Sequence, residues 1–178
     1  MKLSVRRVMP QDIGPMFLLA KRLWTERPVE HPKMDDEELD REMFWVMNNI
    51  QNPMNLFLIA YDGKKPIGYF TGYLQDHIYG KPRRTGVGME IYVIPEKRGR
   101  EVALRMMRMA LDYAISQGAG TFEAGGIVGQ TDKIWQKLGF KPYLVYSYMD
   151  TDAMRKTLGK MQRIIGGAQN VIEAETGS

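Results

Sequence analysis

The chain has 178 residues and a formal net charge of +4, and this length suits one domain with a single substantial core. The absence of cysteine excludes a disulfide framework, a thiolate nucleophile and a cysteine metal site, and two histidines, His31 and His77, are too few and too scattered for a metal cluster, so we expect no metal. No run of about 18 apolar residues is present and residues 1–14 lack the apolar core of a signal peptide, so we expect a cytoplasmic protein with no membrane partner.

The first third of the chain predicts a strand and two helices. Residues 3–8 alternate apolar and polar side chains, as a half-buried strand does, and residues 11–26 place apolar side chains at helical spacing. The acidic residues 35–38 suit the first turn of a second helix, because a helix N-terminus carries a partial positive charge. The apolar face of this second helix would consist of Leu39, Met43, Val46 and Met47.

Strand and turn signals follow the second helix. Residues 54–61 predict a buried strand, residues 62–65 a hairpin turn and residues 66–77 the next strand. Residues 86–94 are rich in β-branched and aromatic side chains, which favour a further strand. Pro95 would end this strand because proline has no N–H to donate to the ladder.

A long helix is predicted next, and Gly118 would end it. Its polar side chains recur every three or four positions, at Glu101, Arg105, Arg108, Asp112 and Ser116. The remaining positions are apolar, which predicts a helix largely buried against a sheet. They are Val102, Ala103, Leu104, Met106, Met107, Met109, Ala110, Leu111, Ala114 and Ile115. Short strands are predicted at residues 120–124 and 143–149.

A basic loop that contains glycine, residues 93–100, joins the strand to this helix. Between Lys81 and Arg108 there are eight basic residues and three acids, a local charge of +5, whereas the rest of the chain sums to −1. Because the first turn of a helix has unpaired N–H groups and a partial positive charge, we expect an anion such as phosphate to bind there. A solvated basic face without a ligand is the alternative.

Residues 89–111, MEIYVIPEKRGREVALRMMRMAL, resemble the acetyl-CoA-binding motif of the GCN5-related N-acetyltransferase (GNAT) superfamily. In that motif a strand ending near Val-x-Pro is followed by Arg/Gln-x-x-Gly-x-Gly/Ala at a helix start. Here the pattern falls on residues 98–103, where the first residue and the final alanine match and Glu101 replaces the central glycine. Residues 131–140, TDKIWQKLGF, resemble the family's short helix ending in Leu-Gly-Phe.

The resemblance covers roughly residues 1–150 and implies an α/β fold with a mixed sheet in the order βααβββαβαβ. We assign residues 1–150 to this acetyltransferase-like domain and residues 151–178 to a C-terminal extension with an additional amphipathic helix and a flexible end. That helix would cover the sheet or contact a partner such as a second copy of the chain. The implied activity is acetyl transfer from acetyl-CoA to a primary amine of a small cationic molecule or a protein.

The resemblance also implies roles for particular residues. The backbone of Ile91, Tyr92 and Val93 would hold the thioester carbonyl and stabilise the developing oxyanion. The pantetheine arm would lie between this strand and residues 120–124. The pyrophosphate would be held by backbone amides of Arg98, Gly99, Arg100, Glu101, Val102 and Ala103, with the two arginines adding charge.

Glu90 is the first candidate for the base that takes the proton of the attacking amine. It lies two positions before Tyr92 in a strand, so both side chains point to one face. A structural ion pair between Glu90 and Arg83 or Arg84 is the alternative. His77 is a second candidate base, with an ordinary loop histidine as its alternative.

The general acid departs from the family pattern. Many relatives place a tyrosine four residues before the terminal Gly-Phe, where this chain has Trp135, whose indole does not usefully protonate a thiolate. Tyr143 is our candidate, with Tyr146 and Tyr92 left open. Together with Glu101, this departure supports an alternative function, a catalytically degenerate interaction or scaffold protein with the same fold.

The charge of residues 26–42 indicates which kind of acceptor the protein would use. From Glu26 to Glu42 there are eight acids and three basic residues, a local charge of −5, and such a rim would attract cationic amines. Helix capping and solubility are the alternative explanation. Nucleic-acid binding ranks last among the functions, because aromatic side chains are not interleaved with the basic cluster.

Overall fold

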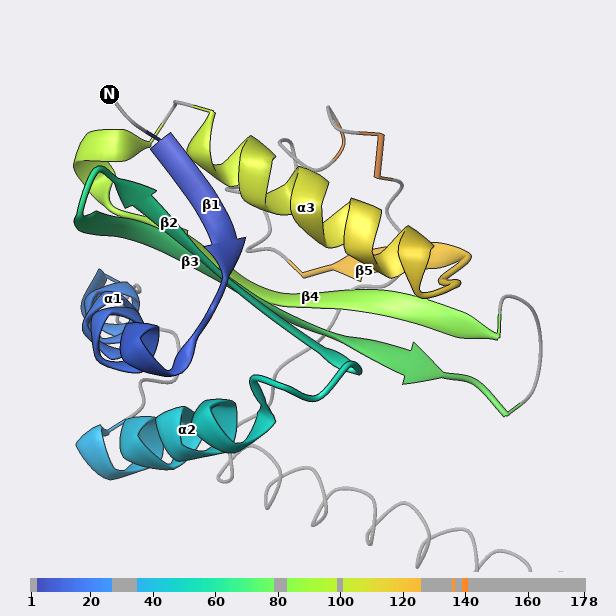
Figure 1. Cartoon of the computed structure of the whole chain (residues 1–178), viewed down its shortest axis with the longest axis horizontal. Coiled ribbons are helices and arrows are strands. Elements are labelled where there is room, and N and C mark those ends of the chain that lie inside the picture. Colours follow the sequence, from blue (N-terminus) through green and yellow to red (C-terminus); the bar gives the residue numbers. More distant parts are fainter. Residues whose placement is uncertain are drawn as a thin grey trace, which may run out of the picture. The chain divides into compact units, whose positions relative to one another are not determined.

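The structure is a computed structural model that describes residues 3–26, 35–78, 83–98, 101–125, 136 and 139–140 (Figure 1). The chain divides into two compact units, Met1–Asp132 and Lys133–Ser178. The elements of the first unit are β1 (Leu3–Arg7), the 3-10 helix η1 (Pro10–Asp12), α1 (Ile13–Glu26), α2 (Asp36–Asn49), β2 (Asn55–Asp62), β3 (Lys65–Asp76), β4 (Arg84–Val93), the 3-10 helix η2 (Pro95–Lys97), α3 (Val102–Ser116) and β5 (Thr121–Ala124).

In the second unit, Gln136 is helical and Gly139 has a positive φ of 90°, as expected at the end of a short helix. The predicted strand at residues 143–149 and the predicted C-terminal helix lie outside the described residues. None of the helices within the described ranges has the length and apolar composition needed to cross a membrane.

The five strands form one mixed sheet in the order β1-β2-β3-β4-β5. The first three pairings are antiparallel, and β4 pairs with β5 in parallel. This confirms the predicted α/β fold with a mixed sheet, and the observed order matches βααβββαβ from β1 to β5. Helix α3 covers one face of the sheet, and α1 and α2 cover the opposite face (Figure 1).

The amphipathic pattern of α3 is mostly as predicted, because its polar row is exposed and its buried row packs on the sheet. Two predicted core positions are wrong, since Leu104 is 51% exposed and Ile115 is 69% exposed. With 3.6 residues per turn, Leu104 lies about half a turn from Val102 and therefore faces solvent. On α2, Leu39, Met43 and Val46 are buried as predicted, whereas Met47 is 47% exposed at the edge of the apolar face.

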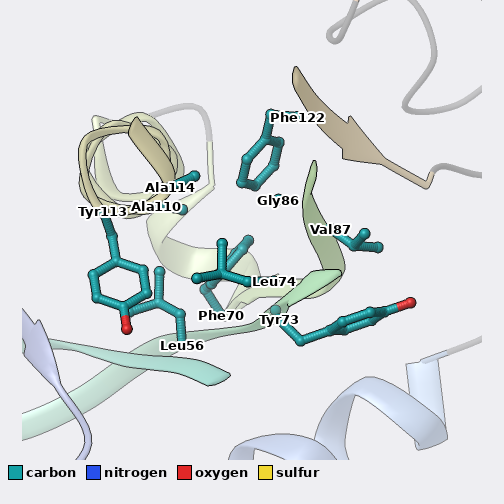
Figure 2. A pocket seen from close by; sticks show the side chains of 11 residues that line it. Leu56, Phe70, Tyr73, Leu74, Gly86, Val87, Ala110, Tyr113, Ala114 and Phe122 are labelled. Atoms are coloured by element: carbon teal, nitrogen blue, oxygen red, sulfur yellow. The ribbon is translucent and has the colours of Figure 1, made fainter. Parts of the chain in front are cut away.

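The face of the sheet under α3 is a close-packed core. A Cβ on Gly86 would lie 2.6 Å from the ring of Phe122 and 2.9 Å from the Cβ of Ala114, so only glycine fits there. The apolar pocket on this face has a volume of ≈ 10 Å³, about the room that one water molecule needs. Figure 2 shows Phe122 directed toward α3 and Tyr73 directed away from it. This pocket is therefore a small packing gap and not a ligand site.

Candidate active site

Strand β4 carries a bulge directly after the last residue for which pairing with β5 is described. Thr71 of β3 lies opposite Glu90, but the next residue, Gly72, lies opposite Gly88, so Met89 is the extra residue of the bulge. Within the described residues, β5 pairs with β4 only as far as Gly88. Downstream of the bulge, the edge of β4 that faces away from β3 therefore has no β5 partner in the part of the chain that the structure describes.

The backbone at this edge is oriented by the antiparallel ladder. The N–H of Ile94 donates to the carbonyl of Ile67 in β3, at 3.0 Å. Since successive residues direct their N–H and C=O groups to opposite edges, the amides of Ile91 and Val93 point away from β3 and that of Tyr92 points toward it. Two of the three backbone positions predicted to hold a thioester carbonyl thus direct their amides to the edge of β4 that faces away from β3.

Glu90 lies on the face of β4 that also carries Tyr92, as its spacing predicts. It is half-buried, and its Oε2 accepts a hydrogen bond from the hydroxyl of Tyr69 at 2.8 Å. The Tyr69 and Tyr92 rings lie side by side, with centroids 6.1 Å apart. The alternative prediction was an ion pair of Glu90 with Arg83 or Arg84. Arg84 instead donates to Asp76, across the β3–β4 pair, at 2.9 Å.

A second cluster joins the end of α1 to the end of β4. The Tyr92 hydroxyl donates to Glu26 Oε1 at 2.7 Å, and burial together with this carboxylate raises the pKa of Tyr92 to about 12. Arg98 forms an ion pair with Glu26, and its Nε donates to the carbonyl of Val93 at 2.9 Å. The guanidinium of Arg98 lies 5.7 Å from the centroid of the Tyr92 ring. Glu26 therefore neutralises part of the positive charge that was predicted to bind a phosphate.

At the start of α3, the side chain of Glu101 is exposed. Its carboxylate accepts a hydrogen bond from Arg105 Nη2 at 2.8 Å along the exposed polar row, as an outward-facing side chain would. Val102 is buried and Ala103 is half-buried behind it. The preceding 3-10 helix η2 is tied to β2 by an ion pair of 2.7 Å between Lys97 and Asp62.

Several predicted site residues lie outside the described residues. They are Gly99 and Arg100 of the loop, Tyr143, Tyr146 and Trp135 of the general-acid prediction, and His31. The other histidine, His77, places its Nε2 3.0 Å from the hydroxyl of Thr85, which lies 2.8 Å from that of Thr121. This row joins β3, β4 and β5 on the far side of the bulge from Glu90.

Four acids of the predicted rim, Asp35, Asp36, Glu37 and Glu38, have structural partners. Asp35 caps α2 by accepting from the Glu38 amide at 2.7 Å, and Glu38 accepts from the Asp35 amide at 3.0 Å. Asp36 pairs with Lys21 at 2.7 Å, and Glu37 pairs with Arg41 one turn along the helix. These contacts favour capping as the main reason for the acidic composition.

The sequence analysis missed Tyr69 as a residue of this site, and it missed Glu26 as the partner of Tyr92 and Arg98. Glu26 meets Tyr92 across 66 positions of sequence, and Tyr69 meets Glu90 across 21. No local pattern marks such pairs, because the two members of each pair lie far apart in the chain. Only the strand register brings each pair together.

A mixed sheet in which the described pairing of β4 with its parallel neighbour ends at a bulge, beside a basic loop and a helix start, defines an α/β fold suited to a phosphate-bearing ligand. Residues 19–140 match the model of the acetyltransferase (GNAT) family, and the chain belongs to this family. No curated protein matches the sequence.

Solved structures of acetyltransferases share the fold. Glucosamine-6-phosphate N-acetyltransferase from Arabidopsis thaliana is 13% identical with a TM-score of 0.66, over 85% of this chain and 99% of that one. A predicted acetyltransferase from Clostridium acetobutylicum, solved with acetyl-CoA, is 19% identical with a TM-score of 0.69, over 83% and 96%. The aminoglycoside N-acetyltransferase AAC(6')-Iy, solved with CoA, is 18% identical with a TM-score of 0.67, over 84% and 95%.

Proposed function

We propose that this protein transfers the acetyl group of acetyl-CoA to a primary amine of a small cationic molecule or of a protein. The observation that carries this proposal is that, among the described residues, the pairing of β4 with β5 ends at Gly88, directly before the Met89 bulge. The amides of Ile91 and Val93 are directed to the edge of β4 that faces away from β3, beside a carboxylate, Glu90, on the adjoining face.

The coenzyme end of the proposal rests on backbone donors. The amides of Ile91 and Val93 would hold the thioester carbonyl and stabilise the oxyanion that forms when the amine attacks. The loop and the first turn of α3 would hold the pyrophosphate, with Arg98 near the end of the loop. Glu101 is compatible with an anion there because its carboxylate is turned to Arg105. Structures of similar fold that were solved with CoA or acetyl-CoA support the same coenzyme.

The acceptor end rests on Glu90. Its carboxylate would take the proton that the amine loses on attack, directly or through a water molecule. Tyr143 stays the predicted acid for the thiolate of CoA. The proposal of a small amine acceptor is supported by two proteins of similar fold, one named for glucosamine-6-phosphate and one for aminoglycosides.

A specific observation favours a second candidate, a catalytically inactive interaction protein of the same fold. The side chain of Arg98 is engaged by Glu26 and by the carbonyl of Val93, so binding of a phosphate has to compete with these contacts. This candidate predicts a partner complex without turnover. A predicted contact through residues 151–178, with a second copy or another protein, belongs to the same test.

Two measurements decide between these candidates. Calorimetry with acetyl-CoA should show saturable binding that weakens at least several-fold in Arg98→Ala and is unchanged in Arg108→Ala, whose side chain is 84% exposed on the polar row of α3. A panel of polyamines, aminoglycosides, amino sugars and lysine peptides should then release CoA thiol. Because the chain has no cysteine, a thiol reagent reports only the product. Absence of acetyl-CoA binding would refute both coenzyme use and catalysis, and binding without thiol release would favour the second candidate.

A further inference from the structure

We propose that Tyr69 is a positioning residue for the base, and that its hydroxyl holds the Glu90 carboxylate in its ionised form and in a fixed orientation. This inference rests on the proposed function, in which Glu90 takes the proton of the amine. The observation behind it is the 2.8 Å hydrogen bond from the Tyr69 hydroxyl to Glu90 Oε2.

The register explains how the two side chains meet. Tyr69 of β3 lies opposite Tyr92, and Thr71 lies opposite Glu90, so Tyr69 and Glu90 are diagonal neighbours on one face of the sheet. A diagonal separation is within reach of a long aromatic side chain. The Met89 bulge follows Gly88 directly and sets this register, because it shifts Glu90 by one position relative to β3.

Tyr69 is well suited to fix a carboxylate, because it is itself fixed. Its side chain is 1% exposed, and its backbone is paired with Ile59 of β2 on one side and with β4 on the other. The Tyr92 ring lies against its own ring, tilted by 44°. A donor held by the centre of a sheet constrains its acceptor more closely than a donor on a loop does.

Charged side chains of α1 and of the loop lie near Tyr92, the neighbour of Glu90 on this face of the sheet. From α1, Arg22 and Glu26 act on Tyr92, the next side chain on the same face, and Arg98 of the loop pairs with Glu26. From β3 comes the Tyr69 hydroxyl. A hydrogen bond to the charged form of a carboxylate favours that form, so loss of the hydroxyl makes Glu90 bind its proton more strongly.

The main variant is Tyr69→Phe, which removes one oxygen and keeps the ring. The matched control is Tyr61→Phe, because the Tyr61 hydroxyl also donates to a buried carboxylate, that of Asp12 at 2.7 Å, on β2 and away from the bulge. We expect the acidic limb of the kcat/KM profile to move to higher pH in Tyr69→Phe, by about a tenfold change in proton affinity. The loss of rate in the variant should therefore be larger on the acidic limb than well above it, whereas a purely structural defect would lower the rate by the same factor at every pH.

A readout that needs no turnover separates this inference from the proposed function. In protein labelled with [δ-13C]glutamate, the Glu90 resonance is assigned by its loss in Glu90→Gln and then titrated in the wild type and in both tyrosine variants. A rise of the titration midpoint in Tyr69→Phe alone supports the inference, even if no amine in the panel is acetylated. An unchanged midpoint in Tyr69→Phe, or an equal rise in Tyr61→Phe, overturns it.

A reciprocal measurement covers the case in which Tyr69→Phe does not fold. The charge of Glu90 should hinder ionisation of the Tyr69 phenol, so Glu90→Gln should lower the pH at which one tyrosine ionises in an ultraviolet titration. The Tyr69 hydroxyl is not a positioning group if Glu90→Gln leaves the tyrosine titration as it is in the wild type.

Discussion

Replacement of Asp12 by asparagine should destabilise the protein and remove part of its acid sensitivity. Asp12 is 1% exposed and accepts hydrogen bonds from three groups: the Arg6 guanidinium, at 2.7 Å from Nη2, the Tyr61 hydroxyl at 2.7 Å, and the Met9 amide at 2.8 Å. Asparagine keeps the shape but loses the charge, and its NH2 group faces donors. These contacts join β1, η1 and β2, so the start of α1 depends on them.

The size of the effect follows from burial. Removing one partner of a buried ion pair costs about 3–5 kcal/mol, and the Arg6 side chain is 41% exposed, which weakens its share of the pair. We therefore expect the free energy of unfolding at pH 7 to fall by about 2–4 kcal/mol in Asp12→Asn.

The pH dependence has a definite sign. Burial alone would raise the pKa of Asp12, but the hydrogen bonds from Arg6, Tyr61 and the Met9 amide outweigh it and lower this pKa below its usual value. In the range between the two values the unfolded chain binds more protons, so stability falls as the pH falls. The contribution of Asp12 is complete above the ordinary aspartate pKa of about 3.9 and is lost as the pH falls through the lower, folded value.

Urea unfolding from pH 7 down to pH 2 checks this prediction in the wild type, in Asp12→Asn and in Asp40→Asn, an exposed control on α2. The gap in free energy between the wild type and Asp12→Asn should be largest at pH 7 and should shrink below about pH 4. A gap that stays constant at low pH would show that the asparagine acts through packing, and the electrostatic reasoning would be wrong.

Three further outcomes follow from single contacts. Gly86→Val should lower stability by about 1–3 kcal/mol in calorimetry, because its Cβ would meet Phe122 at 2.6 Å, whereas Gly14→Ala, with nothing within 4 Å, should be neutral or stabilising. Glu101→Gln should leave the Kd of acetyl-CoA within about twofold, since this carboxylate lies along the exposed row of α3, and a large gain in affinity would contradict that placement. Tyr92 should ionise with a pKa of about 12, so it contributes stability below about pH 10 that is lost as the pH rises toward 12, and Tyr92→Phe should remove this loss in alkaline unfolding experiments.

The fold was largely predictable because its signals are local. The alternation at residues 3–8, the acidic cap at residues 35–38 and the hairpin turn at residues 62–65 each depend on a few adjacent residues, and β1, α2 and the β2–β3 hairpin lie where these signals place them. The exposed Leu104 and Ile115 show the limit of composition. An apolar side chain on a helix is buried only if its angle around the axis matches the sheet beneath it.

The candidate site was predictable only in part. The basic loop and the strand before it carry a family pattern, but the Met89 bulge has no local signal, because it is a property of two strands taken together. From the sequence, the acids at residues 26–42 could either cap a helix or attract a cationic substrate. The reciprocal hydrogen bonds of Asp35 and Glu38 favour capping. Residues that act through a partner far along the chain, such as Tyr69 and Glu26, cannot be found from spacing.

These long-range contacts give α1 a defined role in the site. Asp12 ties the segment before α1 to β1 and β2, and Glu26 ties the last residue of α1 to Tyr92 and Arg98. The helix is thus anchored at both ends by carboxylates, on the same face of the sheet as Glu90. A ligand phosphate that drew Arg98 away would break the ion pair with Glu26, keep the hydrogen bond from the Tyr92 hydroxyl, and so loosen one of these two anchors. Ligand binding at the basic loop would then be coupled, through the ion pair between Arg98 and Glu26, to the position of α1. Glu26→Gln should remove this coupling.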